Sequence, residues 1–456
     1  MDKSSLHIAM YPWFAIGHLT PYLYLSNKLA EKGHTISFFI PINTKPKLEP
    51  LNLYPDYISF VPITLPHVDG LPSDAETTSD VPSTSYPHLM TALDLTESHI
   101  EHLLRDLKPD VVLFDFAYWV PKLTRKLGIK SIHYCVINAA TVGYTMVPAR
   151  QRSGYHFEAD FLQPPSGFPV SSIVLHVHET RLFAGVAKMK FGSDVLFLDR
   201  LFTSFTESDA LGFWTCREIE GPCIDYLVSQ FEKPVLVSGP ILVEPPASTL
   251  EEKWVEWLAS FKAGSVIYCA LGSEIKLTKD QFQELLLGLE LCGSPFLAAL
   301  KPPIGAESVE AALPEGFEER IKGKGMVDGG WVQQRLILGH PSIGCFVTHC
   351  GSGSLLEALR SESQLVMLPQ IPDQIINARV MGKNLKAGVE VEKGEEDGLF
   401  TKRSVCKAVR SVMEVDSEVG RMVRANHAKL RDLMLSEDLQ RSYIDSFCRE
   451  LKDLVG

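Results

Sequence analysis

The chain has 456 residues, of which 45% are hydrophobic and 22% are charged, so it can bury a large core and is neither mostly disordered nor fibrous. At roughly 100–200 residues per domain, this length favours two domains, or three at most. The 44 Lys and Arg residues against 56 Asp and Glu residues give a net charge of −12. Because we find no basic tract, a nucleic acid is not an expected partner.

The cysteines and the N-terminal segment indicate a cellular compartment. The nine cysteines are odd in number and include no C-x-x-C pair, which is typical of free thiols in a reducing environment. Residues 1–13 lack the basic and apolar segments of a secretory signal, and no run reaches the ~18 apolar residues of a membrane span. We therefore expect a cytoplasmic protein without a membrane span, and we expect a monomer.

The first half of the chain alternates between predicted strands and helices. Thr20 and Pro21 suit the cap and the first position of a helix. Apolar patterning predicts a strand, a helix and two further strands at residues 6–13, 21–32, 34–41 and 110–116, respectively. Residues 140–215 mix Pro, Gly and Ser with short helical patterns, and we place no elements there.

The second half repeats the alternation after a break in composition. Residues 237–250 are rich in Pro, Ser and Gly and are interpreted as an interdomain linker. Strands are predicted at residues 265–271, 295–300, 344–347 and 365–368, and helices at residues 278–291, 354–360 and 373–385. Thr278 and Gln281 have the spacing of a capping box, and the chain from Thr401 onward is mainly helical. Two such series predict two α/β domains with parallel sheets.

Two polar residues fall near the ends of predicted strands in the first half. His18 lies in the loop after the first strand, and Asp115 lies at the end of the strand predicted at residues 110–116. Ligands of parallel sheets bind beyond the carboxyl ends of the strands, where an imidazole oriented by a carboxylate can act as a general base. From spacing alone, a solvated or helix-capping histidine is the better explanation of His18.

A second candidate site is the strand–turn–helix segment at residues 344–357. Its Gly- and Ser-rich turn would present free backbone N–H groups and the positive end of a helix dipole to a phosphate. Ser354 and Glu357 also have capping-box spacing, which needs no ligand. His349 beside Cys350 has no further ligand at usable spacing for a metal. The chain shows no nucleophile-elbow motif, no P-loop, and no dinucleotide-binding motif after the first strand.

Residues 331–374 resemble the C-terminal signature box of plant UDP-dependent glycosyltransferases, which belong to glycosyltransferase family one. The matching positions are Trp331, Gln334, His340, Pro341, Gly344, Phe346, Thr348, His349, Cys350, Gly351, Ser354, Glu357, Pro369, Asp373 and Gln374. His18 and Asp115 also fall where that family places its base and the supporting aspartate. The segments 14–18, 119–121 and 331–334 look like the branch that adds a sugar to the sugar of an existing glycoside.

The resemblance implies a fold, a reaction and a division of the chain. The fold would be GT-B, an α/β architecture of two Rossmann-like domains that face across a cleft. Residues 1–240 would bind the acceptor, residues 241–436 would bind a UDP-sugar, and residues 437–456 would form a helix that packs back on the N-terminal domain. The reaction would transfer a sugar, with glucose as the expected one, to a flavonoid, anthocyanin or terpenoid glycoside with inversion. The UDP-sugar is then a co-substrate, and no cofactor or metal is expected.

The resemblance also implies roles for individual residues in donor binding. Trp331 would stack on uracil, although ordinary packing is the alternative, and the Val332 backbone would pair with the base edge. Glu357 would accept hydrogen bonds from the ribose hydroxyls. The same donor site would include Gln334, Ser273, His349, Gly351, Ser352, Gly353, Ser354, Asp373 and Gln374.

Within that donor site, His349, Ser354 and the helix N-terminus would bind the diphosphate, and Asp373 and Gln374 would bind the transferred sugar. Ser273 would lie near the phosphates, or it is simply a turn serine. Ser352 and Gly353 replace the Trp and Asn that are common in the family, so a packing aromatic and an amide are missing and there is room beside the donor.

Two other functions remain open on the same architecture. A nucleotide-sugar epimerase would need additional carboxylates in the cleft and no acceptor domain. A UDP-sugar-binding protein without catalysis would have lost its base, and the presence of both His18 and Asp115 argues against it.

Overall fold

The computed structural model describes residues 5–153, 157–241, 249–414 and 416–456. Contacts divide the chain into two compact units. The first consists of Met1–Val170, Phe183–Ile241 and Glu437–Gly456, and the second of Ser171–Leu182 and Leu242–Ser436. Half of the expected linker at residues 237–250, namely residues 242–248, lies outside the described residues.

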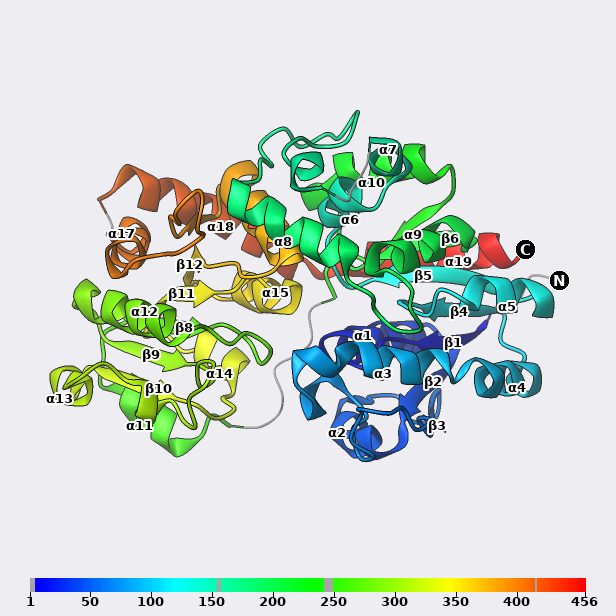
Figure 1. The fold of residues 1–456 in the computed structure, drawn as a ribbon, viewed down its shortest axis with the longest axis horizontal. Helices are drawn as coiled ribbons and strands as arrows, with labels where there is room; N and C mark the ends of the chain where they lie inside the picture. Colours follow the sequence, from blue (N-terminus) through cyan, green and yellow to red (C-terminus); the bar gives the residue numbers. More distant parts are fainter. Residues whose placement is uncertain (1–4, 154–156, 242–248, 415) are drawn as a thin grey trace. The chain divides into compact units, whose positions relative to one another are not determined.

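The first unit is built on a seven-stranded parallel sheet with strand order β3-β2-β1-β4-β5-β6-β7 (Figure 1). Its strands are β1 (His7–Tyr11), β2 (Thr35–Pro41), β3 (Ile58–Ile63), β4 (Val111–Phe114), β5 (Lys130–Cys135), β6 (Ala210–Phe213) and β7 (Val235–Val237). Its helices are α1 (Ile16–Glu31), α2 (Lys45–Leu48), α3 (Tyr86–Asp94), α4 (Glu97–Leu107), α5 (Val120–Leu127), α6 (Ala139–Thr145), α7 (Pro148–Ser153), the second half of α8 (Val177–Lys188), α9 (Phe197–Glu207), α10 (Arg217–Phe231) and α19 (Glu437–Val455).

The second unit is built on a six-stranded parallel sheet with strand order β10-β9-β8-β11-β12-β13 (Figure 1). Its strands are β8 (Val266–Ala270), β9 (Phe296–Ala299), β10 (Gly325–Asp328), β11 (Ile343–Thr348), β12 (Gln364–Met367) and β13 (Gly388–Glu390). Its helices are α11 (Glu252–Ala259), α12 (Lys279–Cys292), α13 (Phe317–Ile321), α14 (Gln334–Leu338), α15 (Ser352–Arg360), α16 (Pro372–Arg379), α17 (Lys402–Met413) and α18 (Glu418–Leu435).

The predicted fold class, two parallel-sheet α/β units, is confirmed. Central strands such as β8 and β4 are buried along their whole length because helices cover both faces of each sheet. This explains why their sequences are continuous apolar runs instead of alternating ones. The chain after Thr401 forms α17, α18 and α19, so its predicted helical character is also confirmed.

Two helices begin earlier than the sequence predicts. Helix α1 begins at Ile16 and not at residue 21, so Pro21 lies inside it. Proline lacks only the one N–H that would bond four residues back, and the helix tolerates that loss near its start. Helix α15 begins at Ser352 and not at residue 354, because Gly351 is extended (φ −61°, ψ 142°) and forms the N-cap.

The capping box predicted for α12 forms only in part. The Thr278 hydroxyl accepts a hydrogen bond from the Gln281 N–H at 3.4 Å, as predicted. The Gln281 side chain does not return to the cap, because its amide pairs with the backbone N–H and C=O of Phe400 at 3.0 and 3.1 Å. The Gln281 side chain therefore bonds to a distant residue, Phe400, in place of the backbone N–H of the cap.

Residues 171–182 belong to the second unit, whereas the sequence-based division places them in the N-terminal domain. A buried ion pair fixes this segment: Nη2 of Arg379 in α16 donates to both carboxylate oxygens of Glu179, at 2.7 and 2.9 Å. Arg379 also pairs with Glu390 on β13. These charges lie deep in the second unit and are satisfied only together.

The last helix, α19, packs within the first unit against α1 and β7. The Tyr443 hydroxyl accepts a hydrogen bond from the Arg217 N–H at 2.8 Å and donates one to Glu218 at 2.7 Å. Gly239 has φ +76°, and a Cβ there would lie 2.5 Å from the Cβ of Tyr443, so only glycine allows this close approach.

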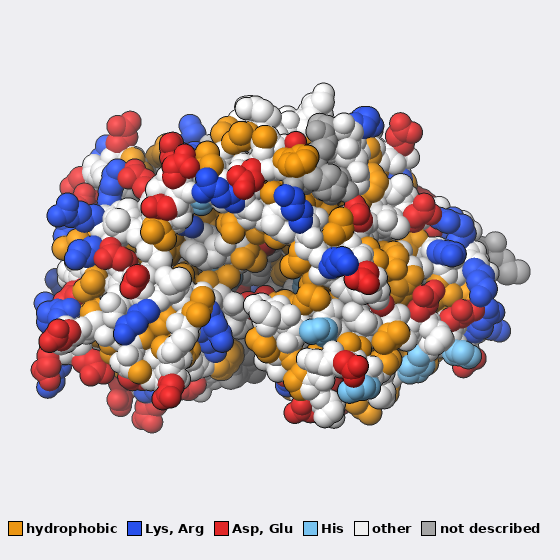
Figure 2. All heavy atoms as spheres, viewed as in Figure 1, with side chains coloured by type: hydrophobic (Ala, Val, Ile, Leu, Met, Phe, Trp, Pro, Cys, Tyr) orange, Lys and Arg blue, Asp and Glu red, His pale blue; other side chains and the backbone are white. Residues whose placement is uncertain are grey.

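Two further features of the described residues are the distribution of charge on the surface and the apolar character of the helices. On the face drawn in Figure 2, Lys and Arg side chains are interspersed with Asp and Glu, so this face offers no continuous basic surface. Among the described residues we find no helix with both the length and the apolar character needed to cross a membrane.

Candidate functional site

The strand ends of the first sheet bring His18 and Asp115 together. Strands β1 and β4 are parallel neighbours, so the residues that follow them emerge at the same edge of the sheet. Asp115 follows β4 directly. His18 lies in the first turn of α1, not in a loop as the sequence analysis expects, because that helix begins at Ile16.

The two side chains form a close polar pair. His18 Nδ1 lies 2.6 Å from Asp115 Oδ2, and the other carboxylate oxygen accepts a hydrogen bond from the Trp13 N–H at 2.5 Å. Asp115 is buried, and burial raises the pKa of its carboxyl, while the contact with His18 opposes that rise. The carboxylate occupies Nδ1, so Nε2 is the nitrogen of His18 that is left to accept a proton.

An aromatic wall adjoins His18 that the sequence analysis does not identify. The Phe116 ring packs edge-on against the His18 ring, with 5.6 Å between centroids. Phe116 has φ +30°, an unfavourable value for a residue with a side chain, and the Arg200 guanidinium donates a hydrogen bond to its carbonyl oxygen at 3.2 Å. Phe191 and Phe197 pack on the other sides of the Phe116 ring, at 5.8 and 5.7 Å. An apolar ring that is only partly buried therefore lies beside the His18 imidazole.

The central strands of the second sheet carry the other candidate site, with His349 following β11. Its imidazole lies between two glycines. A Cβ on Gly272, after β8, would come 2.8 Å from the ring, and a Cβ on Gly351 would come 2.6 Å from His349 Nε2. Burial lowers the pKa of His349 to about 4, so the ring is uncharged at neutral pH. A neutral imidazole can donate a hydrogen bond to a phosphate but does not supply a positive charge.

The turn between β11 and α15 is stabilised by a side chain of α16. Cys350 has φ +69°, and its carbonyl oxygen accepts a hydrogen bond from the Asn377 side chain at 2.8 Å. Ser352, Gly353 and Ser354 form the first turn of α15, where backbone N–H groups are free of helical partners. A Cβ on Gly353 would meet nothing within 4 Å, so there is open space beside this turn.

Glu357 does not cap α15. The N-cap is Gly351, so Ser354 and Glu357 lie inside the helix and form no capping box. Glu357 Oε2 instead accepts a hydrogen bond from Gln334 Nε2 at 2.8 Å, and Oε1 accepts one from Arg335 Nε at 2.9 Å. Arg335 is a residue that the sequence analysis misses, since only the folded chain brings α14 against α15.

Trp331 and Val332 precede α14 and have opposite exposure. The Trp331 side chain is 79% exposed, so it does not serve the ordinary packing that was the alternative to base stacking, whereas Val332 is buried. An exposed indole presents a flat face to a ligand.

The helix α16 carries two further candidate residues near its N-terminus. Gln374 is buried, and its side-chain oxygen accepts hydrogen bonds from the N–H groups of Gln370 and Ile371 at 3.0 and 3.3 Å. Only its amide N–H groups are left for a sugar. Asp373 is half-buried beside it, and Ser273 is exposed in the loop after β8.

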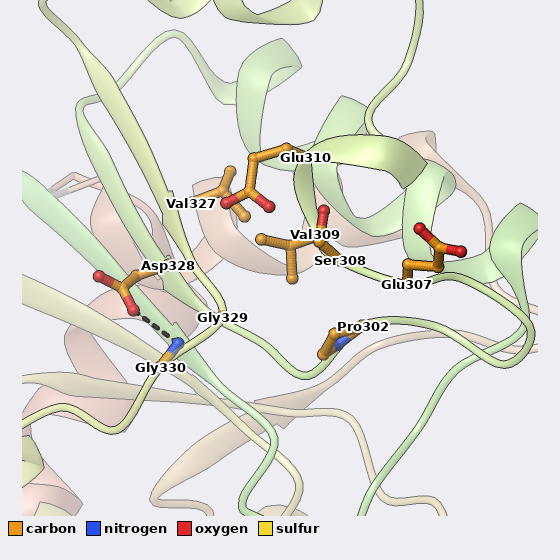
Figure 3. A pocket seen from close by; sticks show the side chains of 9 residues that line it. All are labelled: Pro302, Glu307, Ser308, Val309, Glu310, Val327, Asp328, Gly329 and Gly330. Atoms are coloured by element: carbon orange, nitrogen blue, oxygen red, sulfur yellow. Dashed lines mark hydrogen bonds between the residues drawn. The ribbon is translucent and has the colours of Figure 1, made fainter.

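A hollow of about 380 Å³ lies at the ends of β9 and β10, just before Trp331 (Figure 3). Its lining residues are Pro302, Glu307, Ser308, Val309, Glu310, Val327, Asp328, Gly329 and Gly330, and the Asp328 carboxylate accepts a hydrogen bond from the Gly330 N–H at 2.7 Å. Three of these side chains are carboxylates and none is basic, so this hollow is unsuited to a diphosphate. Within the described chain, no group of three or more His, Cys, Asp and Glu side chains is arranged to hold a metal ion.

Comparisons with known proteins agree with this architecture. The family model described as UDP-glucoronosyl and UDP-glucosyl transferase matches residues 242–426. The chain is 63% identical over 457 residues to a cyanidin 3-O-galactoside 2''-O-xylosyltransferase of Actinidia chinensis var. chinensis, with 100% of both chains covered. It is 58% identical over 456 residues to an anthocyanidin 3-O-glucoside 2''-O-glucosyltransferase of Ipomoea nil, with 100% of this chain and 99% of the relative covered.

Solved structures share the fold at low identity. A Glycyrrhiza uralensis glycosyltransferase complexed with glycyrrhetinic acid 3-O-monoglucuronide matches with a TM-score of 0.81 and 20% identity, over 99% of this chain and 96% of the other. An Arabidopsis thaliana glycosyltransferase complexed with UDP-L-rhamnose matches with a TM-score of 0.76 and 22% identity, over 98% and 99% of the two chains. The GT-B prediction is confirmed, and the epimerase alternative finds no support. The chain belongs to the plant family-one UDP-dependent glycosyltransferases and is a glycosyltransferase enzyme.

Proposed function

We propose that this enzyme transfers a sugar from a UDP-sugar, with inversion, to a hydroxyl on the sugar of a flavonoid or similar glycoside. The relatives named above act, by name, on cyanidin 3-O-galactoside and anthocyanidin 3-O-glucoside, and both join a sugar at the 2'' oxygen. One is a xylosyltransferase and the other a glucosyltransferase, so UDP-glucose and UDP-xylose are the first donors to test.

The observation that carries the acceptor half is the 2.6 Å contact between His18 Nδ1 and Asp115 Oδ2. In our proposal, His18 Nε2 takes the proton of the acceptor hydroxyl as its oxygen attacks the anomeric carbon from the face opposite UDP. Asp115 orients the ring and stabilises the imidazolium that forms. The partly buried Phe116 ring beside His18, supported by Phe197 and the buried Phe191, suits an acceptor with a flat apolar portion.

The donor half is assigned to the second unit. We propose that Trp331 stacks on uracil, that the Val332 backbone pairs with the base, and that Glu357 accepts from the ribose hydroxyls with Gln334 beside it. His349, Ser354, Ser273 and the first-turn N–H groups of Ser352 and Gly353, next to Gly351, would bind the diphosphate. Asp373 and the amide of Gln374 would bind the transferred sugar.

The domain roles and the setting of the enzyme are part of the same proposal. Residues 1–240 would hold the acceptor, residues 241–436 the donor, and the helix at 437–456 would complete the N-terminal domain. We propose a cytoplasmic protein, because the nine cysteines are all free and eight of them are buried, as suits a reducing compartment. We also propose that it acts as a monomer.

The test is a panel of UDP-glucose, UDP-xylose, UDP-galactose and UDP-rhamnose against cyanidin 3-O-glucoside, cyanidin 3-O-galactoside and free cyanidin. We expect UDP release and a product heavier by one sugar with a glycoside acceptor, with the new sugar attached to the existing one and inverted at its anomeric carbon. Turnover with free cyanidin alone would contradict the proposed acceptor. Binding of UDP without turnover of any pair would favour the binding-protein alternative.

A further inference from the structure

The Glu357 carboxylate is held at both oxygens before any ligand is present. Gln334 donates to Oε2 at 2.8 Å and Arg335 donates to Oε1 at 2.9 Å. The two donors are neighbours at the start of α14, and the acceptor lies on α15. The N-terminus of α14 therefore donates one hydrogen bond to each oxygen of the Glu357 carboxylate on α15.

Gln334 is itself anchored to the sheet. The Tyr268 hydroxyl on β8 donates to Gln334 Oε1 at 3.2 Å, and Gln334 Nε2 also reaches Ser354 Oγ at 3.3 Å. Tyr268 is buried and its ring stacks on Phe346 with 5.2 Å between centroids, so the hydroxyl has a rigid base. Burial raises the pKa of Tyr268, which keeps the phenol protonated and able to donate.

These contacts leave Glu357 able to bind a diol. A carboxylate has about four lone-pair sites, and the two contacts with Gln334 and Arg335 use two of them. The remaining sites, one on each oxygen, match the two adjacent hydroxyls of a ribose. Glu357 and Arg335 are 26% and 27% exposed, so the carboxylate is accessible from solvent while its partners are in place.

We infer that Arg335 is a positioning residue that fixes Glu357 for the ribose of the nucleotide. This inference rests on the proposed function, in which Glu357 accepts from the ribose hydroxyls. Both donors bond to an ionised carboxylate, but Gln334 is neutral, so only the Arg335 guanidinium adds the attraction of an opposite charge. Its hydrogen bond restricts the rotamer of Glu357 before the nucleotide binds, so the side chain loses less freedom on binding.

A matched control exists in the same unit. Arg320 pairs with Glu290 through the same atoms, Nε and Oε1, at 2.6 Å, and the two side chains are 43% and 25% exposed. This pair lies on α13 and α12, outside the proposed donor site. If Arg335 were only a surface ion pair, removing either arginine would affect stability alone.

The experiment measures binding of two nucleotides to the full-length chain by calorimetry. UDP is compared with 2',3'-dideoxy-UDP, which lacks both ribose hydroxyls, in the wild type and in Arg335→Gln, Arg320→Gln, Glu357→Gln and the double variant Arg335→Gln/Glu357→Gln. We expect Arg335→Gln to weaken UDP binding on the order of tenfold and to leave dideoxy-UDP binding nearly unchanged. Arg320→Gln should change neither affinity, and the double variant should bind UDP no worse than Glu357→Gln.

The outcomes distinguish a failure of the inference about Arg335 from a failure of the proposed ribose role of Glu357. If Glu357→Gln leaves UDP affinity unchanged, the ribose role of Glu357 is wrong, and the inference is wrong with it. If Glu357→Gln weakens UDP binding but Arg335→Gln does not, or if Arg335→Gln weakens both nucleotides equally or tightens UDP binding, only the inference is overturned. Should Arg335→Gln fold poorly by its melting temperature, Arg335→Lys, which keeps the charge but loses Nε, should show a smaller UDP-specific loss.

Discussion

At the scale of single residues, the contacts of Asp115 with Trp13 and His18 determine which nitrogen of His18 can accept a proton. The Trp13 N–H requires an acceptor at Oδ1, so only the other oxygen faces His18. Burial alone would favour the neutral carboxyl, and the contact with His18 opposes that tendency. Because Oδ1 already accepts from Trp13, Oδ2 is the oxygen that can accept from His18 Nδ1–H, and this arrangement leaves the lone pair of the ring on Nε2.

We expect His18→Ala to lower kcat by about 10²–10⁴-fold while UDP affinity is unchanged, because the base acts only on the acceptor. Asp115→Asn should be nearly as harmful. The Trp13 N–H would hold the amide oxygen, the amide N–H₂ would face His18 Nδ1, and the ring would adopt the tautomer with a proton on Nε2. Steady-state kinetics beside UDP calorimetry tests both variants. A His18→Ala variant that retained half of the wild-type kcat would refute the assignment.

Positions after strands predicted that His18 and Asp115 lie at one edge of the sheet, since parallel neighbouring strands end there, but the resemblance to the family was needed to predict that they pair. The same reasoning could not predict Arg335 or Arg200. Each makes its decisive contact with a residue on another element, 22 positions away in the first case and 84 in the second. No spacing within one helix or one turn encodes such a contact.

At the scale of elements, the β11–α15 turn depends on a missing side chain. Gly351 has a φ of −61°, which any residue can adopt, yet a Cβ there would come 2.6 Å from His349 Nε2. A glycine is therefore required at position 351 because a side chain would collide with the His349 ring, and not because the backbone conformation needs one. Gly353, two residues later, has open space around the position of its Cβ.

We expect Gly351→Ala to displace the His349 ring and to weaken UDP binding on the order of tenfold, equivalent to one lost hydrogen bond to a charged group. Gly353→Ala should raise the melting temperature, since alanine in a helix is favoured over glycine by about 1 kcal/mol. Calorimetric UDP titration and thermal melts of both variants distinguish these effects. Equal UDP affinity in Gly351→Ala and the wild type would show that the ring does not need this space.

Element boundaries were harder to predict than element types. The starts of α1 and α15 were each placed too late, because Thr20, Pro21 and Ser354 are good start signals, whereas the actual N-caps, Ala15 and Gly351, carry no side chain that caps. Between residues 140 and 215, buried arginines such as Arg150 and Arg200 interrupt the apolar periodicity of short helices. The apolar pattern does not predict these helices, because the buried guanidinium groups donate hydrogen bonds to backbone carbonyl oxygens inside the core.

At the scale of the whole molecule, buried histidines connect stability to pH. Burial lowers the pKa of His133 to about 3 and of His349 and His427 to about 4. The unfolded chain binds protons at these side chains near pH ~6.5, so it holds more protons than the folded chain below that value. Their contribution to stability is complete above pH ~6.5 and is lost as the pH falls toward 4.

We expect the melting temperature to fall between pH 6.5 and 5, with each of these histidines removing up to about 1.4 kcal/mol of stability for every pH unit. Differential scanning calorimetry at several pH values measures this, and His427→Gln should make the decrease shallower. A melting temperature that stays constant over this range would contradict the prediction.

The path of the chain between the units has a practical consequence for protein engineering. The backbone passes from one unit to the other after Val170, Leu182, Ile241 and Ser436. A fragment of residues 242–436 would therefore keep the Glu390 partner of Arg379 but lose Glu179 and both of its hydrogen bonds to the buried guanidinium. Removing one partner of a buried ion pair costs about 3–5 kcal/mol, against typical domain stabilities of 5–15 kcal/mol. We expect this fragment to be recovered folded only when residues 171–182 are supplied as a peptide or fused to it, which far-UV circular dichroism and thermal melts can establish. A fragment that melts identically with and without the peptide would contradict this, and a chimera designed to exchange donor specificity between relatives should carry both segments from the same parent.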